Sequence, residues 1–374
     1  MNDVAPRADR SSKPRLLILT PDFPPAHGGV QVLVHRLALG LSGFEVEVVT
    51  LAGPGDRCFD GEGTLAVRRV GAHLGDGPAR RLALNAAGLR AALRFRPDAT
   101  LSAHVVTSPA AALVRRLFGG CTAQYFYANE ILGKPRLAAF AATHADVAIA
   151  ISAYTASLIL ATGASSANLR VIPPGVDLPD EPDAIPAERP TVLTVAQLKH
   201  RYKGHDVLVR AIARVRALVP DVEWVVIGEG TLRPELEALA ASHGLEGCAR
   251  FLGAVSDEQR NRWLRMADVF AMPSRLAGEG FGIVYLEANA FGKPVVAGNV
   301  AGPLDAVVDG VNGLLVDPTD ALAVADAVTR LLLDRALARR LGRDGAARAS
   351  DFAWPLIARR VETALLARFD GSPW

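Results

Sequence analysis

The sequence predicts an α/β protein of two domains, each built on a parallel β-sheet, and two observations lead to this fold class. Short apolar runs alternate with longer Ala-, Leu- and Arg-rich segments of helical periodicity, which is the pattern of repeated βα units. The alternation stops at residues 178–190, which hold four prolines and no periodicity, and then starts again. We therefore expect domains over residues 1–187 and 188–350, followed by a helical segment over 351–374.

The first domain begins with a strand over residues 15–20 (RLLILT), whose continuous apolar run is typical of a strand covered on both faces. A proline- and glycine-rich loop over 21–29 follows, and then a helix over 30–41 whose apolar residues recur at helical spacing. The other expected elements are strands over 44–51, 66–70, 99–102, 145–151 and 169–172, and a helix over 79–95.

The second domain repeats this alternation after the proline-rich segment. The last helix, over 354–369, carries one apolar stripe that includes Ile357, Val361 and Leu365, which indicates packing against a core. The expected strands cover 191–195, 223–227, 249–252, 269–272, 294–297 and 313–316, and the other expected helices cover 206–218, 233–242, 282–291 and 321–335.

Composition excludes several classes of protein. Lys and Arg number 41 and Asp and Glu 39, so the net charge of +2 argues against a dedicated nucleic-acid binder. The three cysteines are far apart and form no C-x-x-C pair, so neither a disulfide framework nor a structural zinc site is expected. No apolar run is long enough for a signal peptide or a membrane span. These features predict a cytoplasmic protein.

One segment, residues 273–287 (PSRLAGEGFGIVYLE), combines two glutamates with closely spaced glycines at the start of an expected helix. Free N–H groups at a helix N-terminus bind phosphate oxygens, and Gly280 and Gly282 let an anion approach the backbone. Glu287 lies inside the helix, where a carboxylate can accept both hydroxyls of a ribose. Glu279, on the loop, is placed to meet whatever is attached beyond the phosphate.

This segment resembles the E-x7-E motif of retaining glycosyltransferases of family 4. Other segments resemble that family in order along the chain, from LLILTPDFPPAHGGVQ through ADVAIAISAY, VIPPGVD and TVAQLKHRYKG to RFLGAVSDEQ and DGVNGLLVDPTD. The resemblance implies the GT-B fold, in which two Rossmann-like domains face each other across a cleft and the C-terminal helix crosses back to the first domain. It also implies transfer of a sugar from a nucleoside-diphosphate sugar with its anomeric configuration retained.

The resemblance places the nucleotide-sugar donor in the second domain and the acceptor in the first. It implies that Glu287 binds the donor ribose, that Glu279 contacts the transferred sugar, and that Lys203 stabilises the leaving diphosphate. The donor-binding residues it implies are Gly28, Gly29, Gln197, Lys203, Gly253, Phe281, Gly282, Ile283 and Glu287, and the catalytic residues are Glu279, Lys203, Tyr127 and Glu130.

Two positions depart from the family pattern. Gln197 stands where the family often has an arginine, and it gives up a charge-assisted contact to the phosphates. Tyr127, in QYFYANEIL, stands where a histidine of an H-G-x-E segment is expected, and a phenol with a pKa of about 10 is a poor base at neutral pH. Glu130 of the same segment is retained and could activate the acceptor. His104 follows an expected strand, either as a hydrogen-bonded strand-end residue, which we favour, or as a residue facing the cleft.

Two further expectations concern metals and membranes. No D-x-D spacing occurs in the sequence, so we expect no metal and no cofactor besides the nucleotide sugar itself. Several arginines accompany the helix over 79–95, and Arg115 and Arg116 end another helix. They form either a solvated surface, which we favour, or a basic surface that contacts the inner membrane face and a lipid-linked acceptor.

We therefore predict a metal-independent, retaining hexosyltransferase of polysaccharide or glycolipid biosynthesis. GDP-mannose is the first choice of donor and a UDP-sugar the second, and the acceptor is a glycan, a lipid-linked molecule or a small metabolite. Two alternatives stay open. One is an epimerase or hydrolase of sugar nucleotides, which needs no acceptor. The other is a nucleotide-binding protein that has lost catalysis through its departures at Gln197 and Tyr127.

Overall fold

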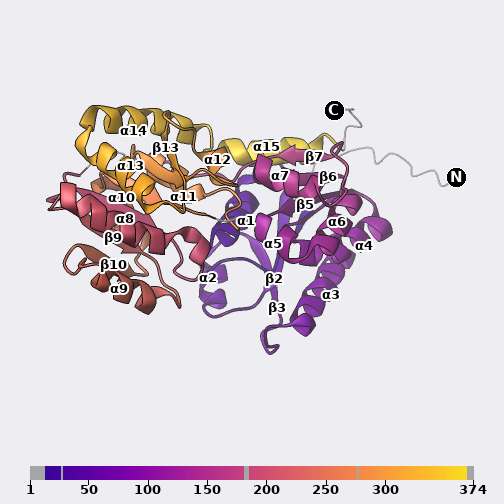
Figure 1. Cartoon of the computed structure of the whole chain (residues 1–374). Coiled ribbons are helices and arrows are strands. Elements are labelled where there is room, and N and C mark those ends of the chain that lie inside the picture. Colours follow the sequence, from indigo (N-terminus) through magenta and orange to yellow (C-terminus); the bar gives the residue numbers. More distant parts are fainter. Residues whose placement is uncertain (1–12, 27, 181–184, 276–277, 369–374) are drawn as a thin grey trace. The chain divides into compact units, whose positions relative to one another are not determined.

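The computed structural model describes residues 13–26, 28–180, 185–275 and 278–368. The chain forms two compact units, each with its own sheet and its own covering helices (Figure 1). Because the chain leaves and re-enters both units, neither is one continuous segment. Of the described residues, unit 1 takes those up to 150, 156–172 and those from 357 onward, and unit 2 takes 151–155 and 173–356.

Unit 1 is built on a parallel sheet with the strand order β3-β2-β1-β4-β5-β6-β7. The chain starts in the middle of the sheet, runs outward through β2 and β3, and then returns to the other side of β1, so β1 and β4 mark the point where the direction of winding switches. The strands are β1 (Arg15–Leu19), β2 (Glu45–Leu51), β3 (Ala66–Val70), β4 (Ala99–Ser102), β5 (Cys121–Phe126), β6 (Val147–Ala150) and β7 (Leu169–Val171).

The helices of unit 1 bury their apolar sides against this sheet. One cluster joins α3 and α4 to β1 and β2 through Leu17, Val49, Leu84 and Val114, and a second joins α6 and α7 to β5 and β6. The helices are α1 (Gly29–Gly40), α2 (Asp56–Glu62), α3 (Pro78–Phe95), α4 (Ser108–Phe118), α5 (Ala128–Gly133), α6 (Pro135–His144) and α7 (Ala153–Leu160), and a short 3-10 helix η1 (Val105–Thr107) precedes α4.

Unit 2 repeats the plan with the strand order β10-β9-β8-β11-β12-β13, so its switch point lies between β8 and β11. The strands are β8 (Thr191–Val195), β9 (Glu223–Ile227), β10 (Ala249–Gly253), β11 (Val269–Met272), β12 (Val295–Gly298) and β13 (Gly313–Val316). The helices are η2 (Arg201–Lys203), α8 (His205–Leu218), α9 (Arg233–Ser242), α10 (Asp257–Met266), α11 (Ile283–Ala290), α12 (Pro303–Ala306), α13 (Ala321–Leu333), α14 (Arg335–Ser350) and α15 (Trp354–Leu366), the last of which continues into unit 1.

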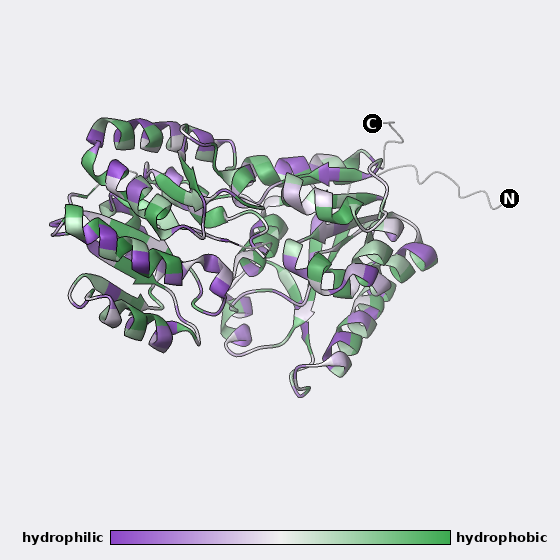
Figure 2. Ribbon diagram, viewed as in Figure 1, coloured by the Kyte–Doolittle hydropathy of each residue, from purple (hydrophilic) through white to green (hydrophobic). Residues whose placement is uncertain are grey.

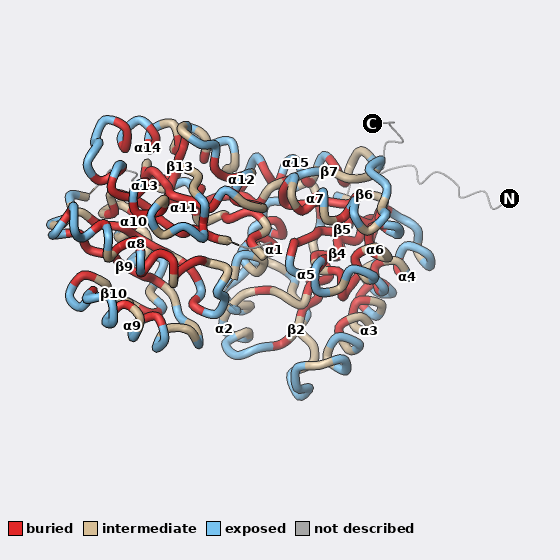
Figure 3. Tube along the Cα trace, viewed as in Figure 1, coloured by how far each residue is buried: buried red, intermediate tan, exposed pale blue. Residues whose placement is uncertain are grey.

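The central strands of both sheets are largely apolar and buried, whereas the outermost strands β3, β7, β10 and β13 are only partly buried (Figures 2 and 3). All residues of β4, β5 and β6 are buried, and so are all residues of β9, β11 and β12. Trp224 of β9 is fully buried, and its indole N–H donates to Thr194 Oγ1 at 3.0 Å, so the largest core side chain leaves no polar atom unpaired. Continuous apolar strands of this kind are expected where helices cover both faces of a sheet.

The C-terminal helix returns to unit 1, as the expected fold class requires. Trp354 packs against Gly175 in unit 2, whereas Glu362 of the same helix accepts a hydrogen bond from the Gly43 N–H in unit 1 at 2.5 Å. Residues of α15 from Ile357 onward therefore belong to unit 1. The predicted end of this helix, residue 369, lies outside the described residues.

The division into units differs from the predicted domain limits. Residues 173–180 and 185–187 belong to unit 2, although the sequence analysis assigned them to the first domain, because the Val176 N–H donates to Phe352 O at 2.8 Å and the Ile185 N–H to Arg265 O at 3.0 Å. Part of the predicted linker, residues 181–184, lies outside the described residues. In the described parts of the chain, no helix is both long and apolar enough to cross a membrane.

Candidate functional site

The predicted donor residues of the second domain lie at the carboxyl ends of the strands of unit 2, most of them at its switch point. Gln197 follows β8 and is exposed, and Glu279 and Gly282 follow the adjacent strand β11. Because parallel strands end at the same edge of a sheet, the two loops lie together there. Gly253 ends β10, two strands away from β8, so it lies farther along the same edge.

Lys203 and Glu279 form an ion pair at this edge. The ammonium donates a hydrogen bond to Glu279 Oε2, and both side chains are largely buried, with 15% and 12% of their surface exposed. Burial disfavours the charged ammonium, but the adjoining carboxylate outweighs it, so the pKa of Lys203 is raised above its ordinary value. Lys203 therefore stays a cation at neutral pH, held by one carboxylate.

Backbone contacts lock the two loops that carry this pair. Gly204 has φ of 76°, and a Cβ there would lie 2.0 Å from the carbonyl oxygen of Pro273. The Arg275 N–H donates to Tyr202 O at 2.8 Å, and the Arg275 guanidinium pairs with Asp206 at 2.9 Å. Only glycine at 204 lets the loops approach this closely, so the position of Lys203 is fixed by backbone packing as well as by charge.

Helix α11 begins beside the ion pair with an uncapped N-terminus. Gly282, in the left-handed region at φ 85°, precedes Ile283, and no side chain caps the first turn. The Tyr285 ring lies where a Cβ on Gly282 would be, and its hydroxyl donates to Met272 O at 2.6 Å, which ties the helix to β11. Phe281 is buried, and its ring centroid lies 5.9 Å from that of Phe352. Its side chain therefore packs in the interior of unit 2 rather than pointing to solvent.

Glu287 lies farther along α11 as a half-buried carboxylate. It makes no hydrogen bond to the described part of the chain. Burial raises its pKa above the ordinary value, while the positive charge of Arg260 opposes that rise. A carboxylate with unused acceptor capacity beside an uncapped helix N-terminus suits a ligand that brings both hydroxyls and phosphates.

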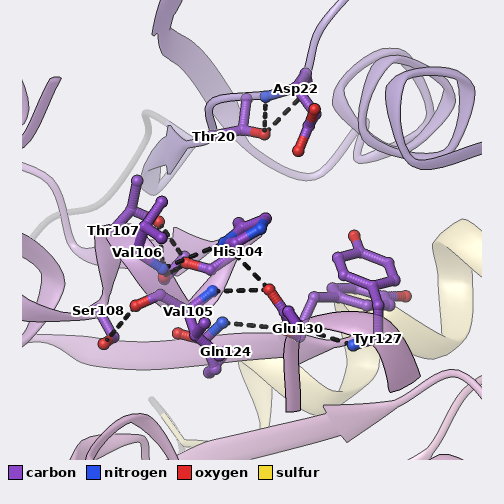
Figure 4. Close-up of polar contacts among 12 residues, drawn as sticks. Thr20, Asp22, His104, Val105, Val106, Thr107, Ser108, Gln124, Tyr127 and Glu130 are labelled. Carbon is purple, nitrogen blue, oxygen red and sulfur yellow. Dashed lines mark hydrogen bonds and ion pairs between the residues drawn. The ribbon is translucent and has the colours of Figure 1, made fainter. Parts of the chain in front are cut away.

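Unit 1 carries a second polar cluster at its own switch point. Asp22 follows β1, and His104 follows the adjacent strand β4 (Figure 4). His104 Nδ1 lies 3.0 Å from Glu130 Oε2, and Glu130 is buried in helix α5. Burial raises the pKa of Glu130 to about 8 and lowers that of His104 to about 4. The sequence predicts a strand-end role for His104, so of these two residues only Glu130 is among the predicted catalytic residues.

The side chain of Tyr127, a predicted catalytic residue, lies in the interior of unit 1. Its side chain is buried, its ring stacks on that of Tyr125 with 6.2 Å between centroids, and its hydroxyl has no hydrogen-bond partner within the described residues. Burial raises the pKa of its hydroxyl well above the ordinary value, so the phenol stays neutral. What Tyr127 supplies is its backbone N–H, which donates to Glu130 Oε1 at 3.1 Å.

The glycine loop of unit 1 lies on the same side as Asp22. Gly28 precedes α1, and a Cβ there would overlap the amide oxygen of Gln31, whose Nε2 donates to Asp22 Oδ1 at 3.0 Å. A Cβ at Gly29 would meet nothing within 4 Å. Of the two predicted donor-binding glycines in this loop, Gly28 therefore has the less room for a side chain. Among the described residues, no group of three or more His, Cys, Asp and Glu side chains is arranged to hold a metal ion.

Comparison with protein families gives two matches that together span both units. Residues 27–179 match the description "Glycosyltransferase Family 4", and residues 179–348 match "Glycosyl transferases group 1". Both agree with the resemblance inferred from the E-x7-E segment.

Curated relatives of known function are similar over most of the chain. The GDP-mannose-dependent alpha-(1-6)-phosphatidylinositol monomannoside mannosyltransferase of Mycobacterium tuberculosis is 32% identical, with 88% of this chain and 92% of the relative covered. The protein of the same name from Mycolicibacterium smegmatis is 37% identical over 60% of this chain and 63% of its own length. The phosphatidyl-myo-inositol mannosyltransferase of Propionibacterium freudenreichii is 36% identical over 63% and 58%.

Solved structures share the fold. HepE from Anabaena, in complex with UDP and glucose, superposes with a TM-score of 0.80 at 21% identity and covers 94% of this chain and 99% of its own. Sucrose-phosphate synthase from Thermosynechococcus elongatus gives 0.82 at 24% identity, covering 96% and 100%. With its two parallel Rossmann-like sheets, the chain has the GT-B fold.

Proposed function

Because the chain belongs to glycosyltransferase family 4 and is therefore an enzyme that transfers a sugar, we propose that it moves mannose from GDP-mannose to an inositol-containing glycolipid. The anomeric configuration is retained and no metal ion takes part. The choice of GDP-mannose and of a phosphatidylinositol mannoside as acceptor is supported by the names of the two mycobacterial relatives, and the name of the third supports a mannosyltransferase that acts on a phosphatidylinositol. The observation that carries the proposal is the buried Lys203–Glu279 pair beside the N-terminus of α11.

The proposed chemistry follows from the charges at that edge. The uncapped N–H groups at Gly282 and Ile283 and the Lys203 ammonium bind the diphosphate, whose negative charge grows as the glycosidic bond breaks. Glu287 accepts the ribose hydroxyls, and Glu279 holds Lys203 until the donor arrives and then contacts the transferred sugar. One cation and a helix N-terminus supply the charge that a metal ion provides elsewhere. The departing phosphate oxygen takes the acceptor proton on the same face, which gives retention.

A lipid acceptor requires contact with a membrane surface, and we propose that unit 1 provides it. A surface cavity of about 660 Å³ lies between α4 and α6, and Leu113, Phe140 and Arg116 are among its lining residues. Arg116 is exposed at the end of α4 and pairs with no described acidic side chain, whereas Arg115 is paired with Asp146 at 2.6 Å. Exposed apolar side chains beside a free arginine suit an anionic lipid surface.

Nucleotide binding is the first test of this proposal. Melting temperatures are measured with GDP, UDP, GDP-mannose and UDP-glucose, each with EDTA and with Mg²⁺. A ligand at a hundredfold excess over its Kd stabilises the native state by about 2.7 kcal/mol. We expect an increase with GDP and GDP-mannose that EDTA leaves unchanged and that Glu287→Ala removes. An increase with UDP compounds alone would assign the donor to the UDP-sugars, the second choice.

Product analysis is the second test. With phosphatidylinositol or its monomannoside as acceptor, the new linkage is examined by NMR, and an α-mannoside is expected from the α-linked donor. An inverted product would overturn the retaining mechanism. Consumption of GDP-mannose without any acceptor would instead favour the hydrolase or epimerase alternative.

A further inference from the structure

We propose that His104 donates a hydrogen bond from its Nε2–H to a sugar hydroxyl at the switch point of unit 1, and that Glu130 is the positioning residue that fixes the tautomer of its imidazole. The proposal rests on the proposed function, because it takes the ligand of this unit to be a carbohydrate. The hydroxyl belongs either to the transferred hexose or to the acceptor, and the experiments below separate these two sources.

The position of His104 in the fold favours contact with a ligand. His104 follows β4 and Asp22 follows β1, the two adjacent strands at which the winding of the sheet reverses. Open parallel sheets bind their ligands outside the carboxyl ends of such strands. The His104 side chain keeps 19% of its surface exposed, and its Nε2 has no hydrogen-bond partner in the described parts of the chain.

A backbone donor sets the tautomer of the His104 ring. The Val106 N–H points at His104 Nδ1, with 3.1 Å between the nitrogens. A backbone N–H can only donate, so Nδ1 must accept and carries no proton. A neutral imidazole then holds its proton on Nε2, the nitrogen that has no protein partner. The free end of the ring is therefore a hydrogen-bond donor.

Glu130 completes this arrangement with a proton of its own. Its Oε2 lies 3.0 Å from Nδ1, and two acceptors cannot stay this close unless one of them is protonated, so the carboxylic acid donates to the ring and shares the one lone pair of Nδ1 with the Val106 N–H in a three-centre hydrogen bond (Figure 4). The Val105 N–H donates to Oε2 at 2.9 Å and the Tyr127 N–H donates to Oε1 at 3.1 Å, which holds the carboxyl group in place. The pair is thus neutral and shares one proton.

The protonation of both groups agrees with this geometry. Burial raises the pKa of Glu130 to about 8, and burial lowers that of His104 to about 4, so both are neutral at pH 7. Neighbouring groups modify these values. The Asp22 carboxylate favours the acid form of Glu130, whereas the Lys134 ammonium opposes it, and Lys134 and Arg81 both disfavour an imidazolium. The Tyr127 phenol, also adjacent, stays neutral.

This arrangement predicts a change of role above about pH 8. When Glu130 releases its proton to solvent, the full negative charge of its carboxylate outweighs the single Val106 N–H donor and draws the ring proton to Nδ1, so the Val106 N–H loses its acceptor and Nε2 becomes an acceptor. His104 then no longer donates to the ligand. Because the phenol of Tyr127 is buried and the described chain leaves it without a partner, that side chain does not replace the lost donor.

The tautomer is tested without any activity measurement. The full chain is labelled with ¹⁵N-histidine, and the His104 resonances are assigned by their absence in His104→Gln. We expect the Nε2–H tautomer at pH 7 and its conversion to the Nδ1–H tautomer above pH 8. An Nδ1–H tautomer or an imidazolium at pH 7 would overturn the proposal, whether or not the protein transfers mannose.

Contact with the sugar is tested by kinetics with the donor that raises the melting temperature. We expect His104→Ala to lower kcat/KM between 10- and 100-fold, the effect of losing one hydrogen bond to a ligand. His104→Gln, whose amide can donate, regains part of the loss. His73→Gln, an exposed histidine on a turn of the same unit, is the matched control and keeps wild-type values. Unchanged kcat/KM in His104→Ala would contradict the proposal.

Two further comparisons identify the source of the hydroxyl and the role of Glu130. If His104→Ala raises KM for the nucleotide sugar and slows donor hydrolysis in the absence of acceptor, the hydroxyl belongs to the transferred hexose. If it raises KM for the acceptor alone, the hydroxyl belongs to the acceptor. Glu130→Gln keeps a donor that does not titrate, so the fall in kcat/KM above pH 8 should disappear. Its persistence in Glu130→Gln would remove Glu130 from the proposal. Absence of transfer by the wild type would instead refute the proposed function, and the NMR result would stand.

Discussion

Each unit places a pair of polar side chains beyond the carboxyl ends of two adjacent strands, β8 and β11 in unit 2 and β4 and β5 in unit 1, but the pairs differ in charge. In unit 2 the pair is ionic, Lys203 with Glu279, and it stands beside an uncapped helix N-terminus. In unit 1 the proposed pair of His104 with Glu130 is neutral, since burial lowers the pKa of His104 to about 4 and raises that of Glu130 to about 8. Two sheets of one topology therefore offer two kinds of site: one suited to phosphates, the other to hydroxyls.

The two units share one type of fold, and the side chains on their loops account for the difference in charge. The switch point brings together the loops after two adjacent strands in either unit, and this follows from topology alone. What the loops carry then sets the chemistry. A positive site stabilises charge that develops on a leaving group, whereas a neutral donor positions a group without attracting competing anions.

The largest expected effect comes from removing the cation of unit 2. Lys203→Ala should lower kcat between 100- and 1,000-fold, since it deletes the charge that we propose meets the leaving diphosphate and leaves Glu279 buried without its partner. The measurement is steady-state kinetics with saturating donor. Arg201→Ala is the matched control, because Arg201 belongs to the same short helix but pairs with Glu235 at the surface. Equal losses in both variants would contradict a special role for Lys203.

The second largest expected effect tests whether backbone packing at Gly204 fixes the position of Lys203. Gly204→Ala places a Cβ against Pro273 O in a left-handed backbone conformation, and we expect it to lower the free energy of unfolding by about 3 kcal/mol. Gly292→Ala is the control: Gly292 has φ of 68° but nothing near its Cβ, so a loss of about 1 kcal/mol is expected. Urea denaturation of both variants measures the difference. Similar losses would show that the approach of the two loops is not as tight as described.

A third prediction concerns pH and the histidine next to Lys203. His205 is buried, its ring nitrogens have no partner in the described chain, and burial lowers its pKa to about 4. The unfolded chain takes up a proton near pH 6.5 and the folded one only near pH 4, so stability is full above pH 6.5 and is lost as the pH falls toward 4. His205→Leu should remove up to about 3 kcal/mol of this acid loss. Thermal unfolding at pH 7 and pH 5 tests it, and an identical pH response in wild type and variant would contradict it.

Much of the fold could be predicted because most of its strands are short apolar runs separated by longer segments of helical periodicity. The ranges expected for β3, β4, β8, β9, β11 and β13 coincide with those observed. Helix α14 was missed, since its sequence RALARRLGRDGAARAS is rich in charge and glycine and shows little apolar periodicity. The boundary between α13 and α14 follows from Asp334, whose side chain accepts the Leu337 N–H at 2.9 Å, a cap that the sequence pattern did not single out.

The residues of the candidate site also differ in how well they could be predicted from the sequence. Glu279, Gly282 and Glu287 of unit 2 could be named from one segment, because they are close in sequence. The pair in unit 1 could not, since His104 and Glu130 come from different βα units and meet only when β4 and β5 lie side by side. The usable signal was a histidine directly after an apolar strand, and Tyr127 drew attention instead because it occupies the family's histidine position.

The smallest expected effect concerns binding to membrane vesicles, and it compares a charge reversal on the surface of unit 1 with one on the surface of unit 2. If α4 and α6 of unit 1 contact an anionic membrane, Arg116→Glu should weaken binding to vesicles that contain phosphatidylinositol, by about 1 kcal/mol for each unit of charge changed. Arg330→Glu makes the same change on the exposed surface of α13 in unit 2 and should leave binding unaltered. Cosedimentation at low and moderate salt measures both, and the difference should shrink as salt screens the charges. Equal weakening in the two variants would mean that net charge, rather than the surface of unit 1, governs the contact.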